Sequence, residues 1–267
     1  MTEPEDNWTA GEAYESYMGR WSRPLARRFV SWLAPSRRAH WIDVGCGTGA
    51  LTSMICEMAE PASVLACDPS ESFVQHARTT VRDLRVAFVV ADADNVPDAG
   101  RARDYVVSGL MLNFVPDAGR AIARMRERLR PGGMLAAYVW DYADGIQFLR
   151  RFWDEAAALE PAAADLDEGR RFPLCQPEAL QALFLGARLG GVGVGSLEIR
   201  TRFRDFQDFW TPFLKGTGPA PAYVASLAQQ QRDSLRERLA RSLPAAADGS
   251  ITLRARAWAA RGVCSSS

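Results

Sequence analysis

The sequence predicts an α/β fold in which helices cover both faces of a mostly parallel β-sheet, as three αβα layers. Short apolar runs alternate with helical patterns of about 10–15 residues, which is the order found in βαβ units. The runs lack polar alternation, as strands do when helices cover both of their faces. Ligands bind such sheets beyond the carboxyl ends of the strands, so the loops that follow the strands are the candidate site.

The first half of the chain contains the clearest alternation of strands and helices. Ser70 and Asp117 are suitable N-cap residues, and Pro131-Gly132-Gly133 ends a helix. The expected elements are a strand at Trp41–Val44, a helix at Ala50–Ala59, a strand at Val64–Cys67, a helix at Glu71–Thr80, strands at Val86–Val90 and Tyr105–Val107, a helix at Ala118–Leu129 and a strand at Met134–Val139.

The second half has a looser pattern. Helices are expected at Phe148–Leu159, Pro177–Leu185 and Tyr223–Ser242, and strands at Val192–Phe203 and Ile251–Ala260. The glycines between Gly190 and Gly195 lead into a strand, not a helix, so they predict a turn and a bulged strand rather than a phosphate cradle. Because no internal repeat or Gly/Ser linker is present, we expect residues 1–267 to form one domain, with a helical insert at about 206–247.

Composition excludes several classes of protein. The 267 residues contain 32 Lys and Arg and 32 Asp and Glu, and this zero net charge does not favour nucleic acid as a partner. No apolar run approaches the roughly 18 residues of a membrane span. The acidic N-terminus is unlike a signal peptide.

Five cysteines without C-x-x-C or metal spacing predict reduced thiols, no metal site and a cytoplasmic location. The oligomeric state is left open.

A glycine-rich loop joins the first strand to the first helix of this pattern. Its sequence is Asp43-Val44-Gly45-Cys46-Gly47-Thr48-Gly49. Glycines let the backbone turn tightly and approach a ligand, and the start of the next helix offers free N–H groups. The loop therefore predicts a site for a nucleotide-like cofactor.

The pattern of this loop is compatible with two kinds of cofactor. Gly45-x-Gly47-x-x-Ala50 satisfies the dinucleotide pattern G-x-G-x-x-G/A, and Asp68 lies at about the right distance to bind a ribose hydroxyl. An NAD(P)-dependent oxidoreductase is therefore one alternative. Against it, Gly49 follows Gly47 by two residues rather than three, Asp43 lies just inside the strand, and the sequence has no Tyr-x-x-x-Lys pair.

The second possibility is more specific. D-x-G-x-G-x-G from Asp43, an acidic residue ending the second strand, A-D-A at 91–93 and P-G-G at 131–133 together resemble class I S-adenosylmethionine (SAM)-dependent methyltransferases. Within that group the chain resembles the ubiquinone and menaquinone biosynthesis branch. The resemblance covers about Trp41–Val139 firmly. It implies a Rossmann-like fold with a seven-stranded sheet whose last strand is antiparallel, SAM as cofactor and S-adenosylhomocysteine (SAH) as product.

The resemblance also implies a division of the chain and a set of cofactor-binding residues. Residues 1–35 would form lid helices, 36–140 the SAM-binding core and 141–267 the substrate side. The methionine end of SAM would contact the loop and its anchor, at Asp43, Gly45, Cys46, Gly47 and Gly49. The ribose and adenine would contact Asp68, Pro69, Ser70, Asp92 and Ala93. The reacting methyl would lie by Ser108, Gly109 and Leu110, and the lid would contribute Tyr14, Tyr17 and Met18.

The methyl acceptor is expected to be a small molecule, modified at carbon, oxygen or nitrogen, and either quinone-like or a specialised metabolite. The candidate substrate wall is mostly aromatic: Trp21, Asn113, Phe114, Trp140, Phe209, Trp210 and Phe213. Packing of the last three rings against the sheet is an equal alternative. No general base is identified; Asp141 and Tyr142 are candidates, and for Asp141 a solvated loop position is the alternative. A SAM-binding module without transfer activity also stays open.

Overall fold

The computed structural model describes residues 15–98, 100, 102–215 and 218–265. In this part of the chain one seven-stranded sheet has the order β3-β2-β1-β4-β5-β7-β6. Its strands are β1 (His40–Val44), β2 (Ser63–Asp68), β3 (Val86–Val90), β4 (Arg103–Gly109), β5 (Leu129–Trp140), β6 (Leu189–Phe203) and β7 (Ile251–Cys264). β7 runs antiparallel to both of its neighbours, and the other neighbouring strands pair in parallel. The predicted α/β fold and its antiparallel last strand are confirmed.

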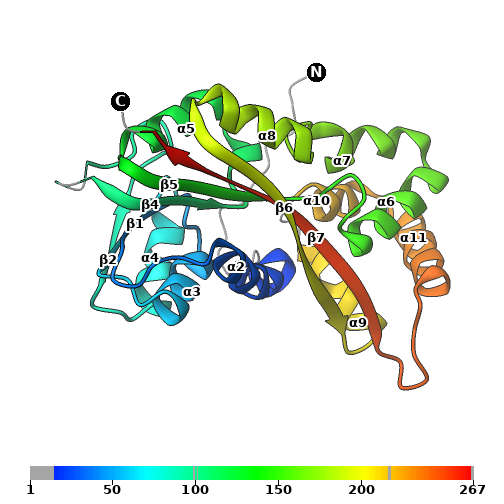
Figure 1. Cartoon of the computed structure of the whole chain (residues 1–267). Coiled ribbons are helices and arrows are strands. Elements are labelled where there is room, and N and C mark those ends of the chain that lie inside the picture. Colours follow the sequence, from blue (N-terminus) through cyan, green and yellow to red (C-terminus); the bar gives the residue numbers. More distant parts are fainter. Residues whose placement is uncertain (1–14, 99, 101, 216–217, 266–267) are drawn as a thin grey trace.

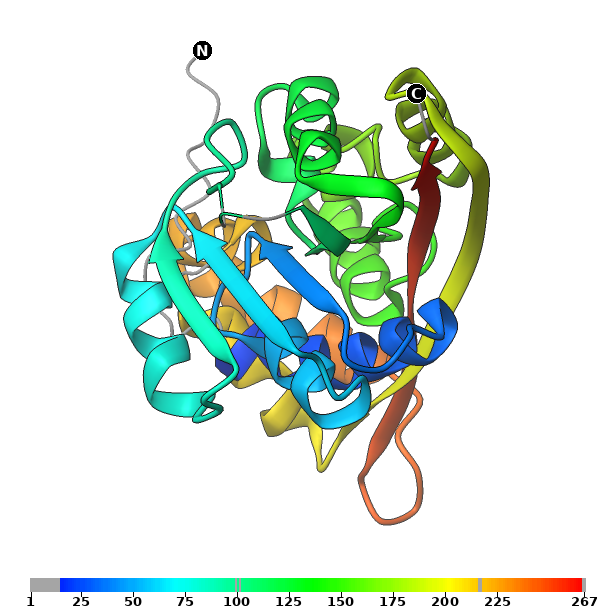
Figure 2. The ribbon, with the colours of Figure 1, turned by 60° about the vertical axis from the view of Figure 1, so that its left-hand side comes forward.

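Helices cover both faces of the sheet (Figure 1). On one face lie α2 (Arg20–Leu33), α3 (Ala50–Met58) and α4 (Glu71–Thr80), and on the other lie α5 (Ala118–Glu127) and α8 (Pro177–Gly186). Shorter elements are the π-helix η1 (Glu15–Gly19), the 3-10 helices η2 (Leu112–Phe114) and η3 (Pro161–Leu166), and α7 (Glu168–Arg171). Figure 2 shows β1, β2 and β3 side by side, with β6 and β7 on the other side of the molecule.

Local signals in the sequence explain where several helices begin. The hydroxyl of Ser70 accepts a hydrogen bond from the N–H of Phe73 at the start of α4. The carboxylate of Asp117 accepts one from the N–H of Arg120, at 2.8 Å, at the start of α5. Both predicted N-caps are therefore confirmed, and each satisfies a backbone donor that the helix leaves free.

Two predicted helices differ from those observed. The helix expected to reach Leu129 ends at Glu127, because Leu129 already pairs with Arg103 as the first residue of β5. The helix expected over Tyr223–Ser242 is divided into α10 (Pro219–Ser226) and α11 (Gln229–Ser242). The backbone between them is extended, and the side chain of Gln231 accepts a hydrogen bond from the N–H of Ala228.

The glycines between Gly190 and Gly195 lie in β6 rather than in a loop that precedes a helix. The register of β6 against β7 shifts between Gly190 and Gly193, which is an irregularity of the kind that a bulge produces. The predicted bulged strand is confirmed, but the predicted turn is not formed by these glycines, because the turn lies before them at 187–188. Farther along the same pair, Phe203 lies opposite Ile251, so the two strands continue well past the end of β5 (Figure 1).

A helical segment fills the chain between β6 and β7. It contains α9 (Phe206–Trp210), the 3-10 helix η4 (Thr211–Lys215), α10 and α11, and it packs on α6 (Gln147–Leu159). Its core is aromatic: the rings of Phe152 and Phe213 are stacked, with centroids 4.6 Å apart and planes 4° apart. None of the helices in the described ranges has the length and hydrophobicity that crossing a bilayer requires.

Candidate functional site

The carboxyl ends of β1, β2, β4 and β5 meet at one cavity of about 350 Å³. The loops after these strands and the first residues of the N-terminal helices enclose it. Its lining residues are Met18, Ser22, Gly45, Cys46, Gly47, Thr48, Ala50, Leu51, Asp68, Pro69, Ser70, Phe73, Gly109, Leu110, Met111, Phe114, Tyr138, Trp140 and Tyr142. The structure therefore brings twelve of the sequence-predicted site residues together: Met18, Gly45, Cys46, Gly47, Asp68, Pro69, Ser70, Gly109, Leu110, Phe114, Trp140 and Tyr142.

Backbone hydrogen bonds to β2 and within the loop hold the glycine loop in place. The N–H groups of Gly45 and Cys46 both donate to the carbonyl of Cys67, at 2.8 and 2.9 Å, and that of Gly49 donates to Cys46. Gly45, Gly47 and Gly49 all have positive φ, which few other residues adopt without strain. Gly49 does not line the cavity: a Cβ there would meet Val81 at 2.9 Å, so this glycine lets α3 pack against the end of α4.

Asp68 connects the end of β2 to the glycine loop. One carboxylate oxygen accepts a hydrogen bond from the N–H of Gly47, and the other accepts one from Ser70, both at 2.9 Å. Burial raises the pKa of Asp68, and these two backbone hydrogen bonds oppose that shift. Each carboxylate oxygen keeps a second lone pair, so Asp68 is fixed in place and can still accept hydrogen bonds from a ligand.

Asp43 lies beneath the loop and is fully buried. One carboxylate oxygen accepts a hydrogen bond from the Thr52 hydroxyl at 2.6 Å, and the other has no hydrogen-bond partner among the described residues. Burial is the largest cause that raises the pKa of Asp43, to about 7, and the charge of Asp68 adds to it. A buried acceptor without a partner usually has an explanation, and a cationic ligand group above the loop would supply one.

The N-terminal elements form one wall of the cavity. Met18 in η1 and Ser22 in α2 line it. Tyr17 does not; its buried ring packs edge-on against Phe213, with centroids 5.5 Å apart. Trp21 likewise packs against Phe203, at 5.4 Å, instead of lining the cavity. The prediction for Tyr14 falls outside the described residues.

Several other predicted residues lie behind the cavity wall or away from it. Asp92 is exposed, and its carboxylate accepts hydrogen bonds from the N–H groups of Asp94 and Asn95, so it stabilises its own turn. Ala93 is buried beside it. Ser108 is fully buried, and neither its hydroxyl nor the side-chain nitrogen of Asn113 has a hydrogen-bond partner within the described ranges. These residues do not line the cavity.

The structure separates the two candidate bases after β5. Tyr142 lines the cavity, and its ring packs against Phe172. Asp141 is 1% exposed and forms an ion pair with Arg256 at 2.6 Å, so the alternative of a solvated carboxylate is wrong. Its second oxygen accepts a hydrogen bond from the N–H of Asp144. Asp141 therefore holds the turn after β5 against β7.

The aromatic residues of the insert form a core. Phe209, Trp210 and Phe213 are 0–3% exposed and do not line the cavity. Phe209 and Trp210 pack around Phe213, with ring centroids 5.4 and 6.1 Å away. A contact between Phe209, Trp210 or Phe213 and a substrate stays a prediction that this geometry does not favour. Phe114 differs, because it lines the cavity with 38% of its surface exposed.

Sequence reasoning missed several lining residues. These are Ser22, Thr48, Ala50, Leu51, Phe73, Met111 and Tyr138. For Tyr138 a signal was present: it lies two residues before Trp140, and alternate residues of a strand share a face. For Met111 there was none, because its side chain reaches the site by covering Gly45, where a Cβ would lie 2.5 Å from the Met111 side chain.

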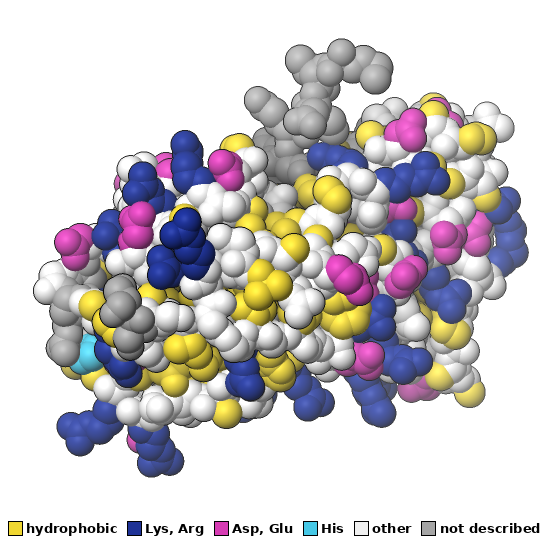
Figure 3. All heavy atoms as spheres, turned by 45° about the horizontal axis from the view of Figure 1, so that its top comes forward, with side chains coloured by type: hydrophobic (Ala, Val, Ile, Leu, Met, Phe, Trp, Pro, Cys, Tyr) yellow, Lys and Arg dark blue, Asp and Glu magenta, His cyan; other side chains and the backbone are white. Residues whose placement is uncertain are grey.

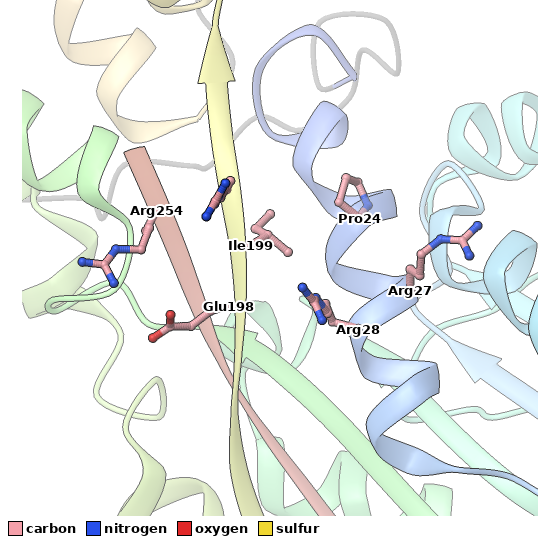
Figure 4. A pocket seen from close by; sticks show the side chains of 7 residues that line it. Pro24, Arg27, Arg28, Glu198, Ile199 and Arg254 are labelled. Atoms are coloured by element: carbon pink, nitrogen blue, oxygen red, sulfur yellow. The ribbon is translucent and has the colours of Figure 1, made fainter. Parts of the chain in front are cut away.

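A second, more open groove of about 730 Å³ lies between α2 and the β6–β7 pair. Pro24, Arg27 and Arg28 line it from α2, and Glu198, Ile199, Arg200 and Arg254 from the strands (Figure 4). No predicted site residue lines it. β6 is an edge strand, where charged side chains discourage pairing with other chains. Elsewhere, Figure 3 shows side chains of both signs around a face whose middle is largely hydrophobic.

The strand order and the glycine loop agree with the fold and the motif that the resemblance to class I methyltransferases implies. The protein family described as a methyltransferase domain matches residues 42–133. The chain is 31% identical to a trans-aconitate 2-methyltransferase of Methylobacterium radiotolerans over 55% of its length and 56% of that protein. It is 35% identical to a ubiquinone/menaquinone biosynthesis C-methyltransferase of Paracoccus denitrificans, over 40% of its length and 44% of that protein. The chain thus spans about half the length of the curated relatives it matches.

A solved structure shares the fold over more of the chain. The phosphoethanolamine N-methyltransferase 2 of Haemonchus contortus, solved with SAH bound, aligns with 98% of this chain and 58% of its own. The TM-score is 0.58 at 18% identity, so this likeness concerns the fold. Together with the family match, it confirms the resemblance to class I SAM-dependent methyltransferases.

Proposed function

We propose that this protein transfers a methyl group from SAM to a small-molecule acceptor. The observation that carries the proposal is the single cavity in which the glycine loop, Asp68 and the ends of β4 and β5 meet. These are the positions that the family resemblance assigns to the cofactor and the reacting methyl. When bound, SAM supplies an activated methyl group on a sulfonium centre.

The chain's own residues suit a cationic cofactor. Asp43 is buried beneath the loop and does not line the cavity, so it would accept from the amino group of SAM through water, with the oxygen that has no partner among the described residues. Asp68 would accept from the ribose hydroxyls through its remaining lone pairs. Pro69, Ser70 and Phe73 would lie beside the adenine, with Met18 over the cofactor. The carboxylate of Asp68 at the cavity wall favours the binding of a sulfonium by charge.

The same contacts argue against a dinucleotide. A dinucleotide loop presents free N–H groups to a pyrophosphate. Here the N–H groups of Gly45 and Cys46 donate to the carbonyl of Cys67 in β2, that of Gly49 donates to a loop carbonyl, and that of Gly47 donates to a carboxylate. No Lys, Arg or His lines the cavity in the part of the chain that the structure describes. A pyrophosphate would therefore face Asp68 without a counter-charge.

The lining also supports an uncharged acceptor. Leu110, Met111, Phe114, Trp140 and Tyr142 make an apolar, largely aromatic wall. The trans-aconitate enzyme has an acidic substrate by its name, and an acid would lack a partner here. A quinone-like ring or a neutral specialised metabolite fits better.

Methyl transfer needs mainly alignment of the nucleophile, methyl and sulfur. Alignment can contribute about 7–11 kcal/mol in favourable cases. Tyr142 lines the cavity and carries a hydroxyl, so it is the proposed group for orienting the acceptor. Burial raises the pKa of Cys46 well above its ordinary value, so its thiol stays protonated and is not a nucleophile.

Thermal unfolding with SAM, SAH, NADH and NADPH tests the cofactor. Ligand at about 100 times its Kd adds about 2.7 kcal/mol to stability. We expect stabilisation by SAM and SAH alone; stabilisation by a nicotinamide alone would overturn the proposal. SAH formation with matched neutral and acidic ring acceptors then tests transfer. Binding without SAH formation across the panel would favour a module without transfer activity.

We also propose a bacterial, cytoplasmic setting. The described part of the chain holds five free cysteines, four of them buried, which suits a reducing compartment. The two relatives named above are bacterial. Fractionation of the source cells, followed by detection of the protein with an antibody, would test this location.

A further inference from the structure

The last residue of β4 is a glycine because a tyrosine ring occupies the space that its side chain would need. Gly109 lies opposite Tyr138 in the parallel register of β4 and β5. A Cβ at Gly109 would lie 2.6 Å from the Tyr138 hydroxyl oxygen and 2.7 Å from Cζ. Distances this short are not tolerated between non-bonded atoms, so only glycine admits the ring in this position. The hydroxyl therefore lies directly over the end of β4.

The surrounding structure fixes Tyr138 in this position. Its side chain is 2% exposed, and its ring packs against Phe29 of α2, with centroids 4.6 Å apart. The carbonyl of Tyr138 accepts a hydrogen bond from the N–H of Leu110 at 2.8 Å. Leu110 itself has φ +62°, a conformation that costs energy for a side chain of this size. Backbone strain of this kind is concentrated at functional sites.

Tyr138 and Gly109 both line the cavity, on the side where Leu110 and Trp140 complete the wall. In the proposed function the reacting methyl lies at this end of β4. We propose that the Tyr138 hydroxyl oxygen contacts the transferable methyl of bound SAM and fixes its direction toward the acceptor. This inference rests on the proposed function, and it assigns a residue that the family motifs do not include.

The physical basis is the polarity of the methyl group. A sulfonium withdraws electrons from its methyl, so the C–H bonds are attracted to an oxygen in contact with them. SAH lacks the methyl and the positive charge, so the contact exists for SAM alone. The hydroxyl is therefore expected to affect the two ligands differently, whereas the ring contributes to both.

Calorimetric titration of SAM and SAH into the wild-type protein and Tyr138→Phe tests the inference without an acceptor. We expect SAM to bind about two- to fivefold more weakly to the variant, with SAH affinity unchanged. Tyr105→Phe is the matched control. Tyr105 is also a tyrosine at the β4–β5 pairing, but its hydroxyl accepts a hydrogen bond from the N–H of Ser36 and it does not line the cavity.

Each outcome has one meaning. An equal loss for both ligands would make Tyr138 a structural wall residue, and no loss for either would remove the contact; both overturn the inference. If the wild-type protein binds neither ligand, the proposed function fails first, and this inference fails with it. Gly109→Ala gives a second test, because the added methyl group must move the Tyr138 hydroxyl away from its position without removing it from the protein. We expect SAM affinity to fall more than SAH affinity in this variant.

Discussion

The carboxylate of Asp68 accepts a hydrogen bond from the backbone N–H of Gly47 at 2.9 Å, which joins the end of β2 to the glycine loop. The contact has two effects. It occupies a loop N–H that would otherwise attract an anion, and it holds a negative charge at the cavity wall. Asp68 therefore adds to the preference of the site for a cation over a phosphate.

Replacing Asp68 should therefore weaken the binding of SAM. We expect Asp68→Ala to lower SAM affinity by at least about 1 kcal/mol, the usual loss for a hydrogen bond to a charged group. Calorimetry on the folded variant measures the change. Asp165→Ala is the control, because that carboxylate is 85% exposed in η3 and far from the loop in sequence. Unchanged SAM affinity in Asp68→Ala would remove this residue from the site.

The buried carboxyl of Asp43 makes stability depend on pH. Burial raises its pKa from 3.8 to about 7, so between these values the folded chain binds more protons than the unfolded chain. The free energy of unfolding therefore falls as pH rises through this window. Glu168, whose pKa burial raises to about 7, acts in the same direction.

Asp43→Asn should reduce this pH dependence while leaving an oxygen for Thr52 to donate to. Urea unfolding at pH 5 and pH 8 should show the variant losing about 2–3 kcal/mol less than the wild-type protein. Asp83→Asn is the control: hydrogen bonds from Arg85 lower the Asp83 pKa to about 2, so that group stays ionised throughout. A variant slope equal to that of the wild type would contradict the assignment.

The ion pair of Asp141 and Arg256 should contribute to stability rather than to ligand binding. Removing one partner of a buried pair costs about 3–5 kcal/mol. The Arg256 side chain is 32% exposed, so we expect Asp141→Ala to cost about 2–3 kcal/mol in chemical denaturation, with SAM affinity unchanged. Replacing Arg256 with Met in the same variant should recover part of the loss. A drop in SAM affinity at full folding would instead return Asp141 to the site.

A variant at Phe213 distinguishes a role in core packing from a direct contact with the substrate. Its ring stacks on Phe152 and meets Tyr17, and it is 1% exposed. We expect Phe213→Ala to cost about 3–5 kcal/mol of unfolding free energy, as for other buried phenylalanines, with little change in SAM affinity. Urea unfolding measures the first quantity and calorimetry the second. Full stability together with weaker acceptor binding would support the direct contact predicted from sequence.

Local signals in the sequence were sufficient to predict most of the helices and strands. The N-caps at Ser70 and Asp117 set helix starts that the structure confirms. The break between α10 and α11 could not be predicted, because Leu227 and Ala228 have no preference for extended backbone and no proline or glycine separates the helices. Tertiary packing imposes that break.

The site was predictable where it depends on backbone and not where it depends on side-chain direction. The glycine loop and Asp68 follow from strand order and spacing alone. Whether an aromatic ring lines a cavity or fills a core depends on contacts distant in sequence, as Phe213 on Phe152 illustrates. Residues such as Met111 reach the site only because a neighbouring glycine leaves space.

The pairing of Phe203 with Ile251 means that the chain leaves the sheet and returns to it at one point. Residues 204–250 are therefore an insertion whose two ends lie side by side at the end of the β6–β7 pair. Among the described residues, the ion pair of Arg20 with Asp208 and the packing of the Tyr17 ring against Phe213 connect this insertion to the N-terminal wall of the cavity. Under the proposed function, substitutions inside this insertion would change how tightly the N-terminal elements cover the cofactor without changing a residue that lines the cavity.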